Sequence, residues 1–437
     1  MLHDIKSESK NNKAFLFFLL LSISIPLPMV FSNICLVLFV LSVFIGFEKV
    51  NFSIDKSTIL PVLLYGLMLV SIFWSIDKVA TSKALSKEIF LFLIPLSFFF
   101  LPNFSKTQKL KILKYYSYSI TIVVLFFLVR AAVRFFISHQ TNVFFYHGEN
   151  DIDSGLVPKL LNAIHVSVFV AIAFFYFLKQ ENKTNWHYVM QFLLFAFLIL
   201  LSSKNIILVV LFLVILDFFY FSKTANKMRL RNLFVFVAIV AVILSFGKLK
   251  ERFEVELNTN TGKSLSSNVL KKLPSGVHNV SIAEAWTREK FTSNDYFPGT
   301  AFRVYQARMF FEIMSENNKW LTGFGLNASQ PMLAKKAVEY KVYLGDENQE
   351  GYQTKNFHNQ YLQVFAELGL FGILLLLLML GLSLKTAIKN KDFVAIAFTI
   401  LMISLFLTES FLWRQRGVLF FTIFYILFNT KSYKEVY

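Results

Sequence analysis

Long apolar stretches recur along most of the chain and are separated by short polar connections. A helix of about 20 apolar residues crosses the roughly 30 Å hydrocarbon core of a bilayer. The pattern therefore predicts about twelve membrane-spanning helices in one continuous bundle. The expected spans lie near residues 14–31, 33–48, 58–75, 88–101, 114–137, 157–178, 186–201, 204–222, 231–246, 365–386, 392–408 and 415–430.

The expected fold class is an all-α, polytopic membrane helix bundle with one large helical loop. Residues 1–246 carry the first nine spans, residues 247–357 form the loop, and residues 358–437 carry the last three. The first span follows a basic N-terminus, as a signal peptide would. It has no A-x-A-like cleavage site and leads directly into the second span, so we expect it to be retained as a helix.

Lysine and arginine are concentrated in alternate connections. The N-terminus, the even-numbered connections and the C-terminus are basic, and such an excess is typical of cytoplasmic loops. We therefore expect both termini in the cytoplasm and the long loop on the periplasmic side. The connection after the third span is an exception, because Lys78, Lys83 and Lys87 lie on the predicted outer side.

The long loop is not of low complexity, and a connection of this length is more typical of a functional segment than of a passive one. Apolar residues at helical spacing predict an amphipathic helix in AFRVYQARMFFEIMSE, residues 301–316. The sequence GFG at 323–325 predicts a turn. A second helical stretch is expected in PMLAKKAVEYKVYL, residues 331–344.

A polar motif stands where the loop returns to the membrane, in NFHNQYLQVFAELGLFG at 356–372. At about 100° per residue, His358 and Gly369 are predicted to share one helix face, with Gly372 on nearly the same stripe. This places a histidine at the outer end of a helix, above small residues that let another helix or a lipid chain approach. The simpler alternative is that Asn359 caps the helix and the glycines only pack it.

Cationic side chains gather at the predicted outer ends of the spans, where the positive-inside bias should deplete them. Any one of them has a structural alternative as a snorkelling anchor or an ion pair, for example with Glu409. Together they predict an outward-facing basic surface that suits the phosphate or diphosphate head group of a lipid. They are Arg130, Arg134, Lys159, Lys204, Arg252, Arg303, Arg308, Arg414 and Arg416.

Composition agrees with a membrane protein. Of 437 residues, 56% are hydrophobic and 16% are charged, against about 25% charged in soluble domains. The formal net charge of +17 lies mostly in the predicted cytoplasmic loops, where it serves topology and contact with anionic lipid, so no nucleic-acid partner is implied. The single cysteine, Cys35, offers no disulfide framework and no cysteine metal site.

Two polar features each allow two interpretations. His165 lies near the outer end of the sixth span, where it is either a hydrogen-bonding side chain of the bundle interior or a functional group. The acidic cluster ENDID at 149–153 is expected to be a solvated loop, and a metal or substrate role is the lesser alternative.

The motif HN-x9-GLFG, from His358 to Gly372, resembles the H-[NSQ]-x9-G-x-x-G signature of the bacterial O-antigen ligases and the related O-antigen polymerases. Other features follow in the order of that family. Arg303 begins the loop helix, a G-x-G turn follows it, and Arg252, just after the ninth span, fits the usual pre-loop position of the family.

The chain departs from the family pattern in two places. In SSKN at 202–205, Lys204 stands where arginine is usual, which keeps the charge but loses the bidentate geometry of a guanidinium. Tyr305 and Gln306 occupy the part of the loop helix where a tryptophan is expected nearby.

The resemblance implies a membrane glycosyltransferase at the outer face of the inner membrane. Its donor would be a glycan on undecaprenyl diphosphate, and its acceptor a hydroxyl on lipid A–core, on another glycan chain or, in some relatives, on a protein. A sugar bonded to diphosphate already carries a good leaving group, so no cofactor is expected. The sequence also has no Walker pattern.

The same resemblance implies a single inverting displacement that needs no metal. His358 would act as the general base on the acceptor hydroxyl. Arg303 would neutralise the departing diphosphate, assisted by Lys204, Arg252 and Arg308. The expected supporting residues are Asn359, Gly369, Gly372, His165 and Arg414.

Three alternatives stay open. A polymerase of the same family uses the same donor, and the sequence does not separate it from a ligase or show whether a chain-length regulator binds. A transporter or flippase of lipid-linked glycans would be expected to place polar groups near the bilayer midplane, whereas the span centres here are nearly free of charge. A membrane scaffold without chemistry fits the bundle but leaves the basic surface unexplained.

Overall fold

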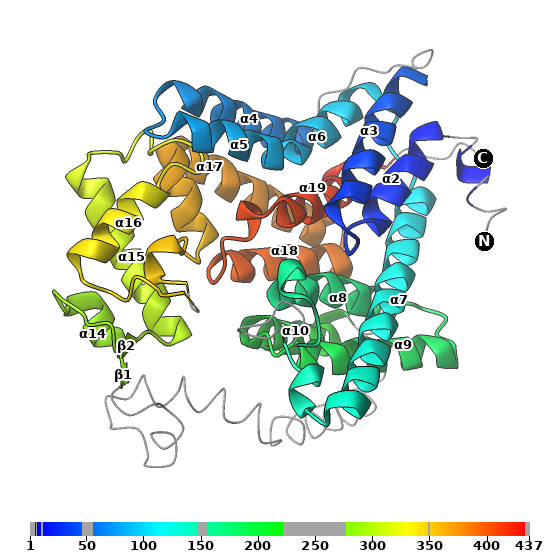
Figure 1. Cartoon of the computed structure of the whole chain (residues 1–437). Coiled ribbons are helices and arrows are strands. Elements are labelled where there is room, and N and C mark those ends of the chain that lie inside the picture. Colours follow the sequence, from blue (N-terminus) through cyan, green and yellow to red (C-terminus); the bar gives the residue numbers. More distant parts are fainter. Residues whose placement is uncertain are drawn as a thin grey trace.

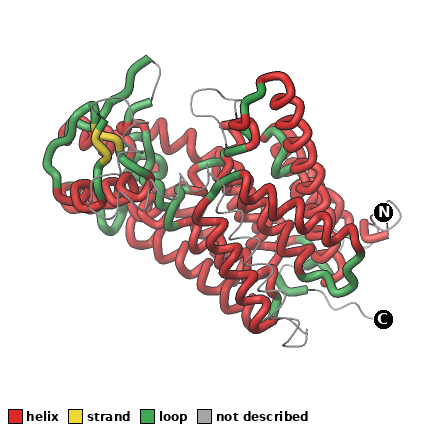
Figure 2. Tube along the Cα trace, turned by 90° about the horizontal axis from the view of Figure 1, so that it is seen from below, coloured by secondary structure: helices red, strands yellow, loops and turns green. Residues whose placement is uncertain are grey.

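A computed structural model describes residues 5, 7–9, 12–45, 56–146, 155–221, 277–347 and 350–432, and these residues are largely helical. The helices form an elongated bundle with a smaller helical region at one end, and both termini lie near the opposite end (Figures 1 and 2). The bundle helices are α2 (Lys13–Ile23), α3 (Met29–Ile45), α4 (Lys56–Val70), α5 (Lys78–Glu88), α6 (Phe90–Phe100), α7 (Lys106–Ser138), α8 (Ala163–Leu178), α9 (Asn185–Leu200), α10 (Lys204–Leu216), α17 (Gln360–Lys389), α18 (Phe393–Phe406) and α19 (Gln415–Asn429).

Four described helical segments, containing α4, α7, α10 and α17, are long and apolar enough to cross a membrane, and seven shorter helices are also apolar. Each expected span therefore has an apolar helix except the ninth, at 231–246, which lies outside the described residues. The predominantly helical fold is confirmed, and the number of about twelve spans stays a prediction.

Several spans differ from the boundaries that the sequence predicted, among them the fifth, since α7 begins at Lys106 rather than near 114. The first ends at Ile23 rather than near 31, because Pro26 and Pro28 follow and proline has no backbone N–H for a helix ladder. The fourth is α6, and it is preceded by the polar helix α5, which is separated from α6 only by Ile89.

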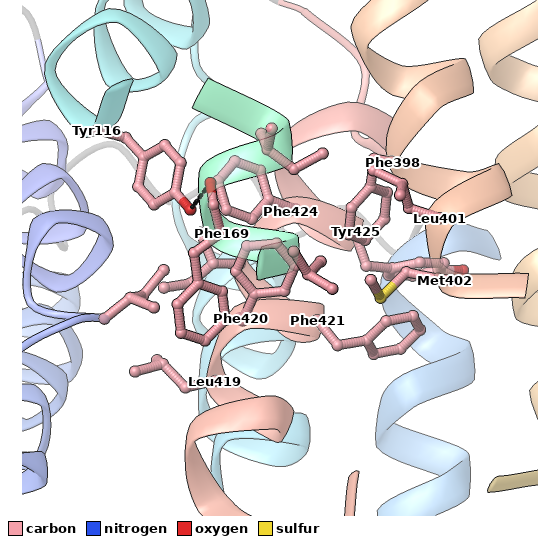
Figure 3. Close-up of a cluster of buried hydrophobic side chains, with 14 of the residues drawn as sticks. Tyr116, Phe169, Phe398, Leu401, Met402, Leu419, Phe420, Phe421, Phe424 and Tyr425 are labelled. Carbon is pink, nitrogen blue, oxygen red and sulfur yellow. Dashed lines mark hydrogen bonds between the residues drawn. The ribbon is translucent and has the colours of Figure 1, made fainter. Parts of the chain in front are cut away.

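The centre of the bundle is built from aromatic side chains. Almost all side chains of α8 and α19 are buried, so these two helices are surrounded by the others. Figure 3 shows part of this core, where the Phe424 ring lies 4.8 Å from those of Tyr116 and Phe420. The Tyr116 hydroxyl donates to the Phe169 carbonyl at 3.0 Å, which satisfies its polar atom. Aromatic pairs of this kind add about 0.5–1.5 kcal/mol beyond the area they bury.

The loop region has its own hydrophobic core, separate from that of the bundle. Its elements are β1 (His278–Asn279), α14 (Ile282–Thr287), β2 (Asp295–Tyr296), α15 (Gly299–Glu316) and α16 (Gln330–Glu339), and β1 pairs with β2 in parallel. The amphipathic helix predicted at 301–316 is confirmed as α15, which buries Phe302, Tyr305, Met309, Phe310 and Ile313. The second predicted helix, at 331–344, is shorter than expected and ends at Glu339 as α16.

Helix α17 is broken at Gly369, whose backbone lies at φ 65° and ψ −160°. This conformation is essentially restricted to glycine. A Cβ atom at Gly369 would lie 2.1 Å from the Leu321 carbonyl oxygen, and the Leu370 N–H donates to the Trp320 carbonyl at 3.0 Å. The predicted turn of the loop therefore docks into the break in the helix.

The turn residues are shaped for the same contact. Gly323, at φ 68°, would place a Cβ atom 2.4 Å from the carbonyl carbon of Glu367. The N–H groups of Phe324 and Gly325 donate to the carbonyls of Ala366 and Glu367 at 2.8 and 2.9 Å. These bonds satisfy carbonyl groups that the broken helix would leave without a partner.

The connection between α4 and α5 holds the opposite side of this turn. The Trp74 indole donates to the Thr322 carbonyl at 2.9 Å, and the Thr81 hydroxyl donates to the Leu326 carbonyl at 2.7 Å. The loop region is thus fastened between α17 and the start of α5, which fixes the position of α15.

Candidate functional site

His358 stands just before α17, not on it. The helix begins at Gln360, and the Asn359 carboxamide oxygen accepts from the N–H groups of Tyr361 and Leu362 at 3.0 and 3.1 Å. The predicted cap is confirmed. The predicted helix face shared by His358 and Gly369 is wrong, because His358 has a positive φ of 47° outside the helix and Gly369 interrupts it.

The imidazole of His358 faces a buried carboxylate. Its Nδ1 lies 3.6 Å from Oε2 of Glu409, and the two side chains are 30% and 9% exposed. The Phe302 ring lies 5.5 Å from the imidazole at 70°, and so lies beside it on the loop side. Within the described residues, Nε2 of His358 has no hydrogen-bond partner. One ring nitrogen is therefore directed to an acid while the other is available to a ligand.

The short segment Leu407–Glu409 joins three helix beginnings at this site. Nε of Arg303, near the start of α15, donates to the Thr408 carbonyl at 2.8 Å. Nδ2 of Asn359 donates to the Leu407 carbonyl at 3.2 Å. Nδ2 of Asn205, near the start of α10, donates to the Thr408 hydroxyl at 2.8 Å.

Two candidate cations lie near the starts of helices that contact this segment. Arg303 is held by Thr408 and by its own helix, since Nη1 donates to the Gly299 carbonyl at 2.9 Å, while Nη2 has no partner among the described residues. Lys204 is the first residue of α10 and adjoins Asn205. The structure thus brings His358, Asn359 and Arg303 to one segment, and Lys204 adjoins Asn205, which contacts the same segment.

Glu409 carries a negative charge at this place. Burial by itself raises the pKa of its carboxyl, but the neighbouring His358 imidazole, with smaller contributions from His165 and Arg303, lowers the pKa to about 2. A carboxylate beside Nδ1 orients the ring so that Nε2 points away from the carboxylate.

Other predicted site residues lie elsewhere or outside the described residues. The Arg308 guanidinium is used within the loop region, where Nε, Nη1 and Nη2 contact Glu312, the Arg288 carbonyl and the Tyr340 hydroxyl, each at 2.8 Å. The structure does not bring Arg308 to His358. Arg252 and the acidic cluster at 149–153 lie outside the described residues.

The two arginines after α18 differ in their surroundings. Arg414 precedes α19 and its side chain is exposed. Arg416 is held against the α2–α3 connection, because its Nη1 donates to the carbonyls of Ile25 and Leu27. The interpretation of an ion pair between Glu409 and one of these arginines is replaced by the pairing with His358.

His165 lies beneath the site at the start of α8 and is completely buried. Neither ring nitrogen has a hydrogen-bond partner within the described part of the chain. Its ring centroid lies 4.3 Å from that of Phe411, which follows Glu409 by two residues. His165 therefore packs under the segment that carries the acid, and a catalytic role for it stays a prediction.

The sequence did not indicate that Glu409 belongs to this site. It is the only acidic residue between Asp392 and Glu435. An isolated carboxylate at the end of an apolar span is costly and therefore points to a function or a partner, and this signal was available in the sequence.

Part of the chain matches the sequence model of a known family. Residues 189–377 match the sequence model of the family described as O-antigen ligase, and the matched range contains Lys204, Arg303 and His358. No curated protein matches the chain. The match supports a place for the chain in the O-antigen ligase/polymerase superfamily, whose members are glycosyltransferase-like enzymes of polysaccharide biosynthesis that work in a membrane.

Acid is expected to destabilise the protein through Glu409. Because the folded protein holds the pKa of Glu409 at about 2, below its ordinary value of 4.5, the carboxylate contributes stability that is full above pH 4.5 and is lost as the pH falls toward 2. The contribution is at most about 3 kcal/mol. Glu409→Gln removes it, so the melting temperature should fall less between about pH 6 and about pH 3 in this variant than in the wild type.

Melting in detergent can be followed by tryptophan fluorescence. The exposed residue Glu289 gives the matched control, because Glu289→Gln should retain the acid-induced fall of the wild type. An equal fall in the wild type and in Glu409→Gln would contradict the assignment.

Proposed function

We propose that this protein transfers a glycan from undecaprenyl diphosphate to an acceptor hydroxyl at the periplasmic face of the inner membrane. The observation that carries the proposal is the pair formed by His358 and the buried Glu409, with Nε2 of His358 open and Arg303 fastened to the same segment. A base and a cation held side by side suit a reaction in which a hydroxyl loses its proton and a diphosphate leaves.

In the proposed step, Nε2 of His358 accepts the proton of the acceptor hydroxyl. The hydroxyl oxygen forms a bond to the anomeric carbon, and the bond from that carbon to the diphosphate oxygen breaks with its electron pair. The configuration at the anomeric carbon inverts. Glu409 stabilises the imidazolium, which then releases its proton to water, because the His358 side chain is 30% exposed.

Arg303 is proposed to stabilise the charge on the departing diphosphate, with Lys204 assisting. Arg303 is already fixed by two hydrogen bonds, so it needs little reorganisation to meet the developing charge. Cationic side chains can neutralise a diphosphate without a metal ion, and the mechanism is proposed as independent of metal.

The acceptor decides between a ligase and a polymerase. Lipid A–core or another surface glycan would be the acceptor of a ligase, whereas a growing glycan on undecaprenyl diphosphate would be that of a polymerase. Both reactions use the same arrangement of His358, Glu409 and Arg303, and the ligase is our primary proposal.

The test uses purified protein in lipid with a glycan on undecaprenyl diphosphate, each candidate acceptor in turn, and no nucleotide or metal. Release of undecaprenyl diphosphate that depends on the acceptor supports the proposal, and the acceptor that works separates ligase from polymerase. No release with authentic substrates, together with movement of the intact lipid-linked glycan across the bilayer, would show a transporter instead.

Arg303→Ala is expected to lower the rate of this transfer by about 100- to 1,000-fold, as does the loss of one preorganised group facing a developing anion. Arg303→Lys should recover only part of the rate, because lysine keeps the charge but not the fork of donors. The rate constants are measured at saturating donor. Lys385→Ala, at an exposed site near the other end of α17, is the control, and an Arg303→Ala variant as fast as this control would refute the role of Arg303.

A further inference from the structure

Helix α5 presents a basic face that the proposed reaction at His358 does not use. Lys78, Lys83 and Lys87 are all exposed, together with Ser82 and Ser86, while Thr81, Ala84, Leu85 and Glu88 on the other side of the helix are buried. At about 100° per residue the exposed positions cover one half of the helix surface. Among the described residues, none of the three lysine ammonium groups has a hydrogen-bond or ion-pair partner.

This basic face lies at the end of the bundle that contacts the loop region. The excess of lysine that is typical of cytoplasmic loops does not account for lysines at this end. Thr81 is bonded to Leu326 of the loop region, and Figure 1 shows α5 beside α4 at the edge of the bundle that adjoins α17. Lysines that set orientation are expected at the opposite, cytoplasmic end. The basic face of α5 therefore calls for an anionic partner on the side of the active site.

Exposed apolar side chains around the start of α5 suit a position at the surface of a bilayer. Phe73 and Ile76, between α4 and α5, and Val79, in the first turn of α5, are 79%, 45% and 65% exposed. Exposed apolar residues next to lysines are typical of segments that lie in the interface, with the apolar groups among acyl chains and the ammonium groups at the level of lipid phosphates.

The C-terminal end of this basic face lies near the beginning of α17. Lys87 lines one small cavity together with Gln360, the first residue of α17, and Trp413, which directly precedes Arg414. A lipid bound along α5 would therefore have its head group beside the His358 end of α17.

We infer that Lys78, Lys83 and Lys87 bind the phosphate groups of the lipid-anchored acceptor, a glycolipid whose sugar head group is phosphorylated. This inference rests on the proposed function, because a transferase with a lipid-linked donor at Arg303 needs a separate place for its second substrate. Phosphates held on α5 leave the outer sugars of the acceptor free to reach Nε2 of His358.

The first test measures binding without transfer. The protein is placed in phosphatidylcholine nanodiscs and titrated with bisphosphorylated lipid A or with the same lipid after dephosphorylation. The variant Lys78→Gln/Lys83→Gln/Lys87→Gln should bind the phosphorylated lipid at least about tenfold more weakly than the wild type. Both proteins should bind the dephosphorylated lipid equally, and the three Lys→Arg changes at these positions should preserve binding.

The matched control replaces three exposed lysines at the other end of the bundle, Lys385→Gln/Lys389→Gln/Lys391→Gln, and should bind as the wild type does. Unchanged binding by the α5 variant would overturn the inference. An equal loss of binding to phosphatidylglycerol would also overturn it, because the face would then be a general contact for anionic phospholipid.

The second test uses the transfer assay. The α5 variant should have a raised KM for a phosphorylated acceptor and an unchanged KM for the donor. If the wild type transfers no glycan while the binding results hold, the proposed function fails and the phosphate-binding surface stands. If the wild type transfers glycan but the variant has an unchanged acceptor KM, the surface fails and the proposed function stands.

Discussion

Replacing His358 with alanine is expected to lower the rate constant for glycan transfer by about 100- to 10,000-fold, the usual range for loss of a general base. The donor KM should change little, because Arg303 and its anchor at Thr408 do not depend on the imidazole. The measurement is single-turnover release of undecaprenyl diphosphate at saturating donor and acceptor, which separates the chemical step from binding.

The loop region contains a matched control pair. His278 lies 3.0 Å from Glu284, and both side chains are more exposed than those of the site. His278→Ala and Glu284→Gln remove a histidine–glutamate pair of the same type away from α17, and both variants should transfer glycan at the wild-type rate. If His358→Ala kept a rate within about threefold of these controls, His358 could not be the general base.

Glu409→Gln tests the other half of the pair. The amide keeps the shape of the side chain but removes the charge that stabilises the imidazolium. Transfer should slow. His358→Ala/Glu409→Gln should be no slower than His358→Ala alone, since residues that act as a unit do not add.

The sequence predicted features that depend on local patterns. Apolar runs located the apolar helices of the described bundle but not the polar helix α5, and the apolar spacing at 301–316 located α15. A cap at Asn359 was one of the two interpretations of its motif. These predictions succeed because hydrophobic periodicity and capping act over a few residues. The motif around His358 and the position of Arg303 indicated the site for the same reason.

The sequence did not predict contacts that form between distant segments. Two whole helices, α17 and α18, separate Glu409 from His358 along the chain, and no spacing rule relates the two residues. The break at Gly369 was missed because an apolar run with two glycines also suits an unbroken helix. Its conformation is set by the turn at 320–325, which enters from the loop and accepts and donates backbone hydrogen bonds there.

Gly369→Ala is expected to be the most damaging single substitution in the loop-to-bundle contact. The new methyl group would meet the Leu321 carbonyl oxygen at 2.1 Å, and the backbone at φ 65° and ψ −160° strains any residue other than glycine. The loss in the free energy of unfolding should be about 2–5 kcal/mol, which combines backbone strain with a displaced turn. Unfolding is measured in mixed micelles with increasing denaturing detergent.

Gly381→Ala is the matched control, because Gly381 lies on the same helix and a Cβ atom there would meet nothing within 4 Å. This change should be neutral or stabilise by about 0.5–1 kcal/mol, since alanine is the better helix residue. Gly323→Ala, on the other side of the contact, should resemble Gly369→Ala, and the double variant should lose less than the sum of the two. Equal stability of Gly369→Ala and Gly381→Ala would mean that the turn does not hold the broken helix. The position of Arg303 beside His358 would then need a support other than this contact.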